Sequence, residues 1–299
     1  MSDGPSGPPV TRGARWRRGL TERVLLLGPG FAYIVVLFLI PLGLIISLAF
    51  FQRGRFGGVV YEPTLANFER ALQPVFIQVL IDSVIIAGIT TGLALLIGFP
   101  TAWVIANLPG RWRVVALILV VLPFWTNFLI RTYAWIVLLN REGVVNGALQ
   151  AFGIIDEPLT LLYTDGAVVA GLLYAYLPLM ILPLYSSIER LDPELREASA
   201  NLGARPARTF ISVTLPLTMP GVLIGSIFVF VPSIGNFVIP ELLGGGKTVM
   251  VGNLIRDQFL KARDWPFGSV LAIVVIASLM GLLVLQSWLS RRTETTADA

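Results

Sequence analysis

The sequence predicts an all-α integral membrane protein with six transmembrane helices. Of its 299 residues, 55% are hydrophobic and only 13% are charged, whereas charged residues make up about a quarter of an average soluble domain. Six apolar runs are each long enough to cross the roughly 30 Å of hydrocarbon in a bilayer. We therefore expect the chain to lie in a membrane, with the lipid bilayer as one of its partners.

The first predicted element is a basic tail followed by a retained span. Residues 1–23 are rich in Gly, Pro and Arg and have no apolar periodicity, which predicts a disordered tail. The apolar run at 24–51 is too long for the hydrophobic part of a signal peptide, and no clean cleavage site follows it. We expect this run to be the first transmembrane helix.

Five further spans complete a transmembrane domain over residues 24–290, and residues 291–299 form a short C-terminal tail. The five spans are expected near 80–106, 114–139, 167–188, 215–240 and 268–290. Six prolines interrupt these runs and each removes a helix hydrogen bond, so kinked helices are expected: Pro100, Pro123, Pro178, Pro183, Pro220 and Pro232.

Two glycine pairs offer places for close helix approach. They are Gly88-x-x-x-Gly92 in the second predicted span and Gly221-x-x-x-Gly225 in the fifth. In a glycine-rich membrane chain, this spacing more often reflects general packing than one specific contact face.

The distribution of lysine and arginine predicts the orientation. The N-terminal tail, 107–113, 189–213 and the C-terminal tail together carry 13 of these residues, and the opposite loops carry 8. Cytoplasmic segments hold the excess of positive charge. Both termini and the 189–213 loop are therefore expected in the cytoplasm of a bacterial inner-membrane protein.

Several kinds of chemistry are excluded by composition. The chain has no cysteine and no histidine, which removes disulfides, thiol catalysis and the commonest metal ligands. A hydrolase in the membrane would have to rely on a carboxylate pair or a Ser/Lys arrangement, and no lysine falls within a predicted span. The +4 net charge does not indicate nucleic-acid binding, because the arginines lie at the ends of apolar runs rather than in one patch.

The polar stretch 191–221 stands out between two apolar runs. Asp192, Pro193 and Glu194 predict a helix start, and Gly203 predicts its end. Pro206 can then open a second short helix. These features alone leave two interpretations open, a docking element and a solvated loop that happens to be helical.

Gly244-Gly245-Gly246-Lys247-Thr248 is predicted to be a turn and not a phosphate-binding loop. That loop requires a glycine where this chain has Glu241. We therefore expect no ATP site and no bound cofactor or metal in this chain.

Polar and aromatic residues near the outer ends of the spans are candidates for a pathway. Arg131 and Glu241 are charged groups at these ends, where snorkelling to the interface is an equally good interpretation. Trp125 and Tyr133 belong to an aromatic group that could contact an amine through cation–π interactions, or else form an interfacial belt. If an acid neutralises Arg131, Asp82 and Asp165 are the candidates.

At EASANLGARPARTFISVTLP the sequence resembles the cytoplasmic coupling loop of binding-protein-dependent ABC importer permeases. The family pattern is Glu-Ala-Ala, three residues, Gly, nine residues and Ile-x-Leu-Pro. Here Glu197-Ala198-Ser199 precedes Gly203, and Val213-Thr214-Leu215-Pro216 follows at the family spacing. Serine replaces the second alanine and valine replaces isoleucine. The resemblance implies the type I ABC importer permease fold, with a coupling helix between the fourth and fifth spans.

The resemblance extends over nearly all of residues 20–290 and is strongest to the spermidine/putrescine group, in particular its first permease subunit. The segments PFWTNFLIRTYAW, GNFVIPELLGGGK, VGNLIRDQFL and DWPFGS carry it. It implies that this chain is not an enzyme by itself but the permease of an ATP-driven importer. Its partners would be a second similar permease, two copies of a cytoplasmic ATPase that holds ATP and Mg, and an extracytoplasmic binding protein.

The resemblance also implies residue roles. Glu197, Ala198, Ser199 and Gly203, with Leu215 and Pro216 of the motif, would couple the chain to the ATPase. Replacing Gly203 with Asp should leave the chain inserted but reduce transport and substrate-stimulated ATP hydrolysis.

For the substrate path we expect Trp125 and Tyr133 on the third span and Phe237 and Glu241 on the fifth, because a carboxylate and aromatic faces offset the lost hydration of a polyamine. The alternatives are the same machine for another small organic ion or an iron complex, and an ATP-independent secondary transporter or channel.

Overall fold

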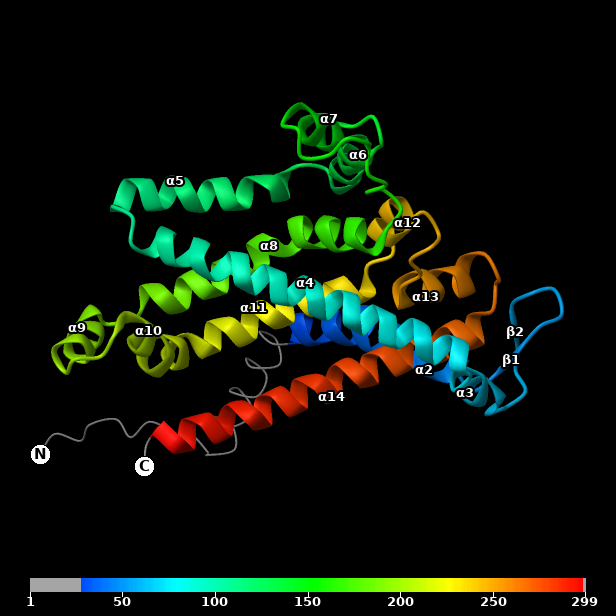
Figure 1. The fold of residues 1–299 in the computed structure, drawn as a ribbon. Helices are drawn as coiled ribbons and strands as arrows, with labels where there is room; N and C mark the ends of the chain where they lie inside the picture. The colour runs from blue at the N-terminus through cyan, green and yellow to red at the C-terminus, as the bar shows by residue number, and fades with distance from the viewer. Residues whose placement is uncertain (1–27, 298–299) are drawn as a thin grey trace, which may run out of the picture.

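The computed structural model describes residues 28–297, and the described chain is almost entirely helical. The predicted tail at 1–23 lies outside the described residues. The helices α4 (Pro74–Ala106), α8 (Asp165–Glu189), α11 (Leu215–Gly235) and α14 (Trp265–Ala297) run side by side and form the bundle (Figure 1).

Shorter elements gather at the two ends of this bundle. At one end lie α9 (Pro193–Asn201) and α10 (Pro206–Thr209), and the last turns of α14 point the same way (Figure 1). At the other end lie an antiparallel hairpin of β1 (Gln52–Arg53) and β2 (Val59–Val60), α3 (Ala66–Ala71) and α13 (Val251–Leu260).

Four helices in the described residues are long and apolar enough to cross a membrane: Gly28–Leu48, Pro74–Ala106, Asp165–Glu189 and Pro206–Gly235. A bent pair makes up to five, and Trp265–Gly281 is a shorter apolar helix at the start of α14. The helical membrane protein predicted from composition is therefore confirmed. α14 continues as a helix to Ala297, beyond the predicted end of the last span at residue 290.

The third predicted span, 114–139, is not one straight helix. Gly110–Trp125 and Phe128–Ala151 meet at an angle of 92°. The first part is α5 (Gly110–Val121) followed by a 3-10 turn (Leu122–Trp125), and the second begins with α6 (Phe128–Leu139) and continues into α7 (Val144–Ala151). Pro123 has no N–H to continue the α5 ladder. Asn127 then starts a new helix, because its side chain accepts hydrogen bonds from the backbone of Leu129 and Ile130.

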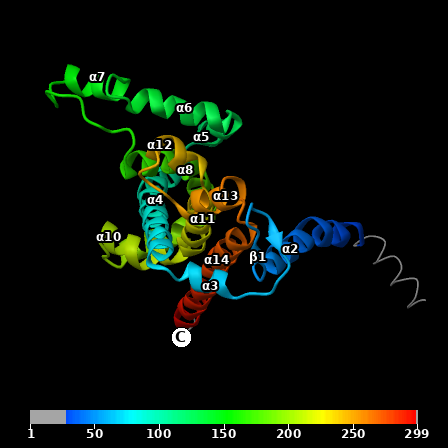
Figure 2. The same ribbon diagram turned by 90° about the vertical axis from the view of Figure 1, so that its right-hand side faces the viewer.

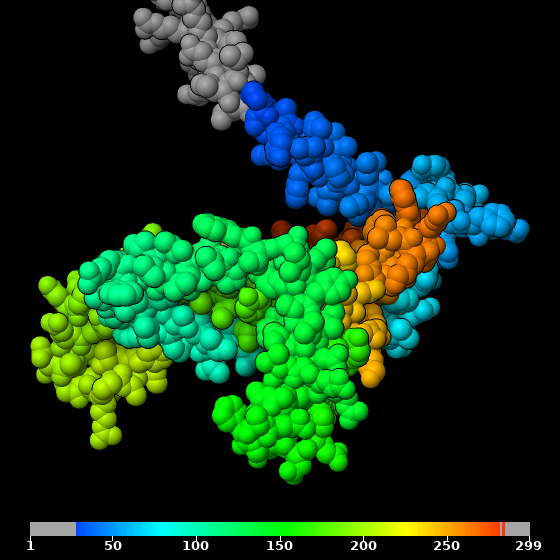
Figure 3. All heavy atoms as spheres, turned by 90° about the horizontal axis from the view of Figure 1, so that it is seen from above, coloured from blue at the N-terminus to red at the C-terminus, as the bar shows by residue number. Residues whose placement is uncertain are grey.

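The first span lies at the side of the bundle, where its last turns contact α14. It leaves the rest of the molecule at an angle (Figures 2 and 3), and its last turns are α2 (Ile40–Leu48). None of its span residues is buried within this chain. Its apolar side chains therefore face lipid or another subunit, which is consistent with a membrane protein that assembles with partners.

Two π-helical turns explain local departures from the ideal helix. One covers Val35–Leu39 and the other Phe210–Thr214, and each ends two residues before a proline. The N–H immediately before the proline reaches five residues back, from Ile40 to Val35 and from Leu215 to Phe210. Proline has no N–H and its ring crowds the carbonyl four residues earlier. The wider turn is the local response to these prolines.

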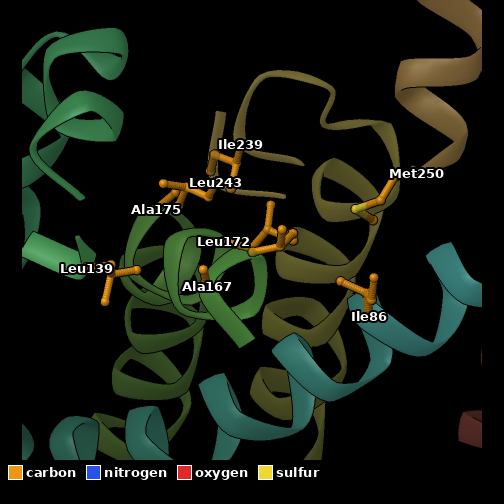
Figure 4. Packing of buried hydrophobic residues seen from close by; sticks show 9 residues of the cluster. Ile86, Leu139, Ala167, Leu172, Ala175, Ile239, Leu243 and Met250 are labelled. Atoms are coloured by element: carbon orange, nitrogen blue, oxygen red, sulfur yellow. The ribbon is translucent and has the colours of Figure 1, made fainter. Parts of the chain in front are cut away.

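The tightest part of the core lies where α8 meets α12 (Val238–Gly244). Leu172 and Ala175 of α8 share one buried cluster with Ile239 and Leu243 of α12, and Ala175 lies beside Ile239 and Leu243 in Figure 4. Burying apolar side chains of this size is worth roughly 1.5–3 kcal/mol each when they leave water. A second core cluster joins α4, α8 and α11, so α8 is the central helix of the bundle.

Candidate functional site

The 191–221 stretch forms the two short helices that its sequence predicts. The Asp192 side chain accepts a hydrogen bond from the Glu194 N–H at 2.9 Å, and Pro193 occupies the first turn of α9. Gly203 follows the helix with a φ of +82°, a left-handed conformation that glycine adopts without strain. Pro206 opens α10, which continues through the π turn into α11.

One side-chain contact ties the two short helices together. The hydroxyl groups of Ser199 on α9 and Thr209 on α10 lie 2.9 Å apart and share a hydrogen bond. An alanine at position 199, as in the family pattern, could not make this bond. Glu197 and Ala198 are exposed, so they remain free to contact a partner, while Leu215 and Pro216 lie at the start of α11.

The helix α9 presents two different faces. Leu195, Ala198 and Leu202 are exposed along one side, and Leu202 has 89% of its surface accessible. Arg196 lies on the other side, with its guanidinium 5.0 Å from the ring of Trp103 at the end of α4. The outward stripe is available for docking, whereas the inner side already contacts the bundle.

At the opposite end, Phe237 and Glu241 meet an arginine from α13. Arg256 donates to the Glu241 carboxylate at 2.7 Å, and its guanidinium lies 5.5 Å from the centre of the Phe237 ring. Asn253 donates to the Phe237 carbonyl at 2.8 Å and to the Glu241 carboxylate at 3.2 Å. The carboxylate and aromatic face expected to meet a substrate amine are thus in contact with a cation of the chain itself.

Charge is balanced within this cluster by Asp257. Partial burial raises the pKa of Asp257, but hydrogen bonds from Arg256 and Lys261 outweigh it and leave the pKa below its ordinary value. Burial lowers the pKa of Arg256, and the hydrogen bonds to Glu241 and Asp257 reverse this, so the net pKa is raised. Asp257 and Arg256 are both charged at neutral pH.

Trp125 and Tyr133 lie on the two sides of the 92° bend. Trp125 ends the 3-10 turn with 80% of its surface exposed, and Tyr133 on α6 is 56% exposed. Within residues 28–297, no hydrogen bond or ring contact joins either of them to Phe237 or Glu241. The structure thus brings together two of the four residues predicted for the path.

Arg131 has different partners from the predicted ones. Its guanidinium donates to the Pro123 carbonyl at 3.0 Å and lies 5.8 Å from the ring of Tyr174. Asp82 instead accepts from Gln78, and Asp165 accepts from Thr248. Neither of these two candidate acids forms an ion pair with Arg131 in the described residues. The Pro123 carbonyl at the break in the helix, which also accepts from Thr126, lies close enough to Arg131 to be its acceptor. Sequence spacing alone does not reveal this.

The glycine-rich segment 244–248 is a turn, as predicted. Gly245 and Gly246 have φ values of +58° and +78°, and the Lys247 N–H bonds back to the Gly244 carbonyl. Arg256 and Asn253, by contrast, were not singled out from the sequence. A cation and an amide on one amphipathic helix after the fifth span were the available signal, but only the folded chain shows which carboxylate they meet.

Comparison with known proteins identifies the family. The family model described as "Binding-protein-dependent transport system inner membrane component" matches residues 94–295. The chain is 42% identical over 260 residues to the spermidine/putrescine transport system permease protein PotB of Escherichia coli K12, covering 87% of this chain and 94% of that protein. It is 34% identical to the inner membrane ABC transporter permease protein YdcU of the same organism, covering 91% of each.

A solved structure shares the fold. A bacterial ABC transporter that imports the acidic polysaccharide alginate matches with a TM-score of 0.68 at 19% sequence identity, over 93% of this chain and 99% of that one. At this identity the likeness concerns the fold. The chain belongs to the family of inner-membrane components of binding-protein-dependent transport systems.

Proposed function

We propose that this protein is a permease subunit of an ATP-driven importer that translocates polyamines such as spermidine and putrescine. The observation that carries the proposal is the 42% identity to PotB, which extends over 87% of the chain and includes the segments 123–135 and 235–247. The Glu241 carboxylate and the Phe237 ring supply the groups that stabilise an ammonium ion outside water.

The proposed complex contains a second similar permease, two copies of a cytoplasmic ATPase that bind ATP and Mg, and an extracytoplasmic binding protein that delivers the polyamine. Family membership supports dependence on a binding protein. The exposed first span offers an apolar surface that a second permease can cover. Each conformational state of such a machine is favoured by differential contacts with ATP and with the loaded binding protein.

We further propose six spans with both termini in the cytoplasm. The four long apolar helices, the bent pair counted as one span and the shorter apolar start of α14 would together make six crossings. In this arrangement residues 1–23 and 291–299 are cytoplasmic tails of the transmembrane domain at 24–290. The position of α9 and α10 at the same end as the last turns of α14 supports this orientation (Figure 1).

The coupling role is assigned to α9 and the turn after it. Its exposed stripe would seat α9 on the ATPase, and Glu197, which is exposed on a different side of the helix, would pair with a basic group at the edge of that contact. The Ser199–Thr209 bond and the left-handed Gly203 hold α9 in a fixed relation to α10, and therefore to α11 beyond Leu215 and Pro216. A displacement of α9 by the ATPase would be transmitted to α11, because α10, the π turn and α11 are continuous.

For the path, Phe237 and Glu241 form the proposed outer contact, with Trp125 and Tyr133 reached in another conformation. A polyamine amine that approaches Glu241 competes with Arg256 for the same carboxylate oxygen. Release of Arg256 toward Asp257, which it already contacts at 2.6 Å, would leave Glu241 free for the substrate.

The deciding experiment is ATP-dependent uptake by the reconstituted complex, with spermidine and putrescine compared with other organic ions and an iron complex. We expect polyamine uptake that requires ATP and the binding protein. Glu241→Gln should raise the KM for polyamine several-fold, because a single charge–charge contact is typically worth about 1–2 kcal/mol. The exposed Glu142→Gln is the matched control. Uptake of a non-polyamine solute alone would show that polyamines are not the substrate. An unchanged KM in Glu241→Gln would show that Glu241 does not contact the substrate.

A further inference from the structure

An open cavity of ≈ 420 Å³ lies beneath α9 and has no part in the proposed transport path. Its walls come from the inner side of α9, the turn that follows it, α10 with the π turn, and the end of α4. Trp103, Arg196, Ala204, Thr209 and Phe210 are among the residues that line it. Because the lining is largely apolar, its one charged side chain determines which ligand charge the cavity favours.

That charged group is Arg196. No carboxylate lines the cavity within the described part of the chain, and the buried Nε atom of Arg196 has no hydrogen-bond partner there. The central carbon of its guanidinium lies 5.0 Å from the centre of the Trp103 ring. A buried donor without an acceptor costs roughly 1–3 kcal/mol. A planar guanidinium with free N–H groups is suited to binding a phosphate in bidentate fashion.

The cavity lies at the level of the membrane interface. Trp103 is three residues before the end of the candidate span Pro74–Ala106, where an amphipathic ring sits among lipid headgroups. Phe210, on the rim, and the neighbouring Ile211 are exposed by 38% and 65% of their surface. The exposed ring of Phe210 gives the cavity an apolar rim beside the charged Arg196. A ligand with a phosphate and an attached hydrocarbon region would match both the arginine and this rim.

The surface proposed for the ATPase does not compete with this cavity. With about 3.6 residues per turn, Leu195, Ala198 and Leu202 fall on one side of α9. Arg196 and Ala200 fall nearly opposite and line the cavity. A partner docked on the exposed stripe therefore leaves the cavity open from the side of the bilayer.

We propose that this cavity binds the phosphate headgroup of an anionic phospholipid, with Arg196 as the phosphate ligand. Trp103 and Phe210 contact the glycerol and the beginning of the acyl chains. The bound lipid contacts both α9 and the end of α4. It therefore stabilises the position of α9, the helix proposed to contact the ATPase. This inference requires only that the chain spans a membrane, and it holds whichever solute is transported.

The test is native mass spectrometry of the complete complex released from nanodiscs of phosphatidylcholine with phosphatidylglycerol. We expect the wild-type complex to retain phosphatidylglycerol in preference to phosphatidylcholine. Arg196→Gln should lower that retention about tenfold, the effect of losing one charge-assisted contact. Ala204→Phe, which fills the cavity while keeping Arg196, should lower it as well. Arg190→Gln, an exposed arginine outside the cavity, is the control and should retain the lipid.

Three results would overturn the proposal. Equal retention of both lipids would mean an ordinary annular contact, and equal retention by Arg196→Gln and wild type would remove the arginine from the site. Displacement of the lipid by millimolar inorganic phosphate would assign the site to a soluble anion. Because lipid retention is read without transport, failure of polyamine uptake and failure of the lipid site are separate outcomes.

Discussion

Single residues at the two ends of this molecule set the geometry of larger elements. Gly203 is the clearest case, because its φ of +82° is required by the turn between α9 and α10 and nothing lies within 4 Å of a Cβ placed there. Space is therefore not the constraint at this position. The constraint is backbone conformation, which most L-residues adopt only at a cost of roughly 1–2 kcal/mol.

Gly203→Val is accordingly expected to reduce binding-protein-stimulated ATP hydrolysis by the complex, because a β-branched residue shifts the turn and with it the orientation of α9. Gly203→Asn is the matched control, since asparagine tolerates the left-handed region. Hydrolysis by purified complexes of equal subunit composition measures the effect. If the valine variant matched the asparagine variant, the left-handed turn would have no role in coupling.

Asp264 is a second residue with a wide effect. It is fully buried, accepts from Arg70 at 2.7 Å and caps the Phe267 N–H, while the Arg70 guanidinium lies 3.9 Å from the Phe267 ring. These contacts fasten α3 to the start of α14. The sequence marks DWPFGS as a family segment, but the partner of its acid lies 194 residues away.

Asp264→Asn should lower the free energy of unfolding by about 1–3 kcal/mol, less than for a fully buried pair because Arg70 is partly exposed. The midpoint of thermal unfolding in detergent measures this. Asp156→Asn, which changes an exposed acid, should leave the midpoint unchanged. Equal midpoints for the two variants would show that the Arg70 contact contributes nothing.

At the scale of elements, the two glycine pairs have different structural roles although their sequence spacing is identical. A Cβ at Gly221 would lie 2.5 Å from the Ser187 hydroxyl and 2.7 Å from the Pro183 carbonyl, so α11 and α8 touch there. At Gly88 and Gly92 a Cβ would meet nothing within 4 Å. Sequence spacing identifies small residues on one helix face, but the partner helix decides which of them are needed.

Gly221→Ala is therefore expected to destabilise the bundle by roughly 1–3 kcal/mol through overpacking. Gly88→Ala should be neutral or slightly stabilising, since alanine favours the helix by up to about 1 kcal/mol over glycine. Thermal unfolding of both variants in the same detergent gives the comparison. Equal destabilisation by the two substitutions would show that Gly221 is not required for the close contact between α8 and α11.

The helix ends predicted from neighbouring residues agree with the structure. The third predicted span differs from the structure, because the chain bends sharply close to a proline. Asp192, Gly203 and Pro206 mark the ends of α9 and α10 by capping and conformational rules that need only neighbouring residues. Kinks were expected from the prolines, but the 92° bend at residues 126–127 was not. Its angle depends on the cap supplied by Asn127 and on the packing of α6 against α12, which lies about 110 residues further along the chain.

At the scale of the whole molecule, hydrophobicity determines that the chain enters a membrane but not how its pieces meet. Composition and apolar runs were sufficient for the helical membrane class. The pairing of Glu241 with Arg256 was beyond sequence reasoning, because the two residues lie on different helices joined by the 245–250 turn. The same holds for Arg131, whose hydrogen-bond partner is the Pro123 backbone carbonyl at the bend.

The proposed orientation makes a prediction for the whole chain that its composition makes easy to test. Because the natural sequence has no cysteine, a single introduced cysteine is the only thiol to label. Asn201→Cys on α9 and Phe56→Cys at the tip of the hairpin, where the side chain is 98% exposed, lie at opposite ends of the bundle (Figure 1). In spheroplasts a membrane-impermeant maleimide should label Phe56→Cys at once and Asn201→Cys only after permeabilisation. Labelling of both from the same side would contradict the arrangement of the bundle across the membrane, and the reverse order would invert the chain and place α9 away from ATP.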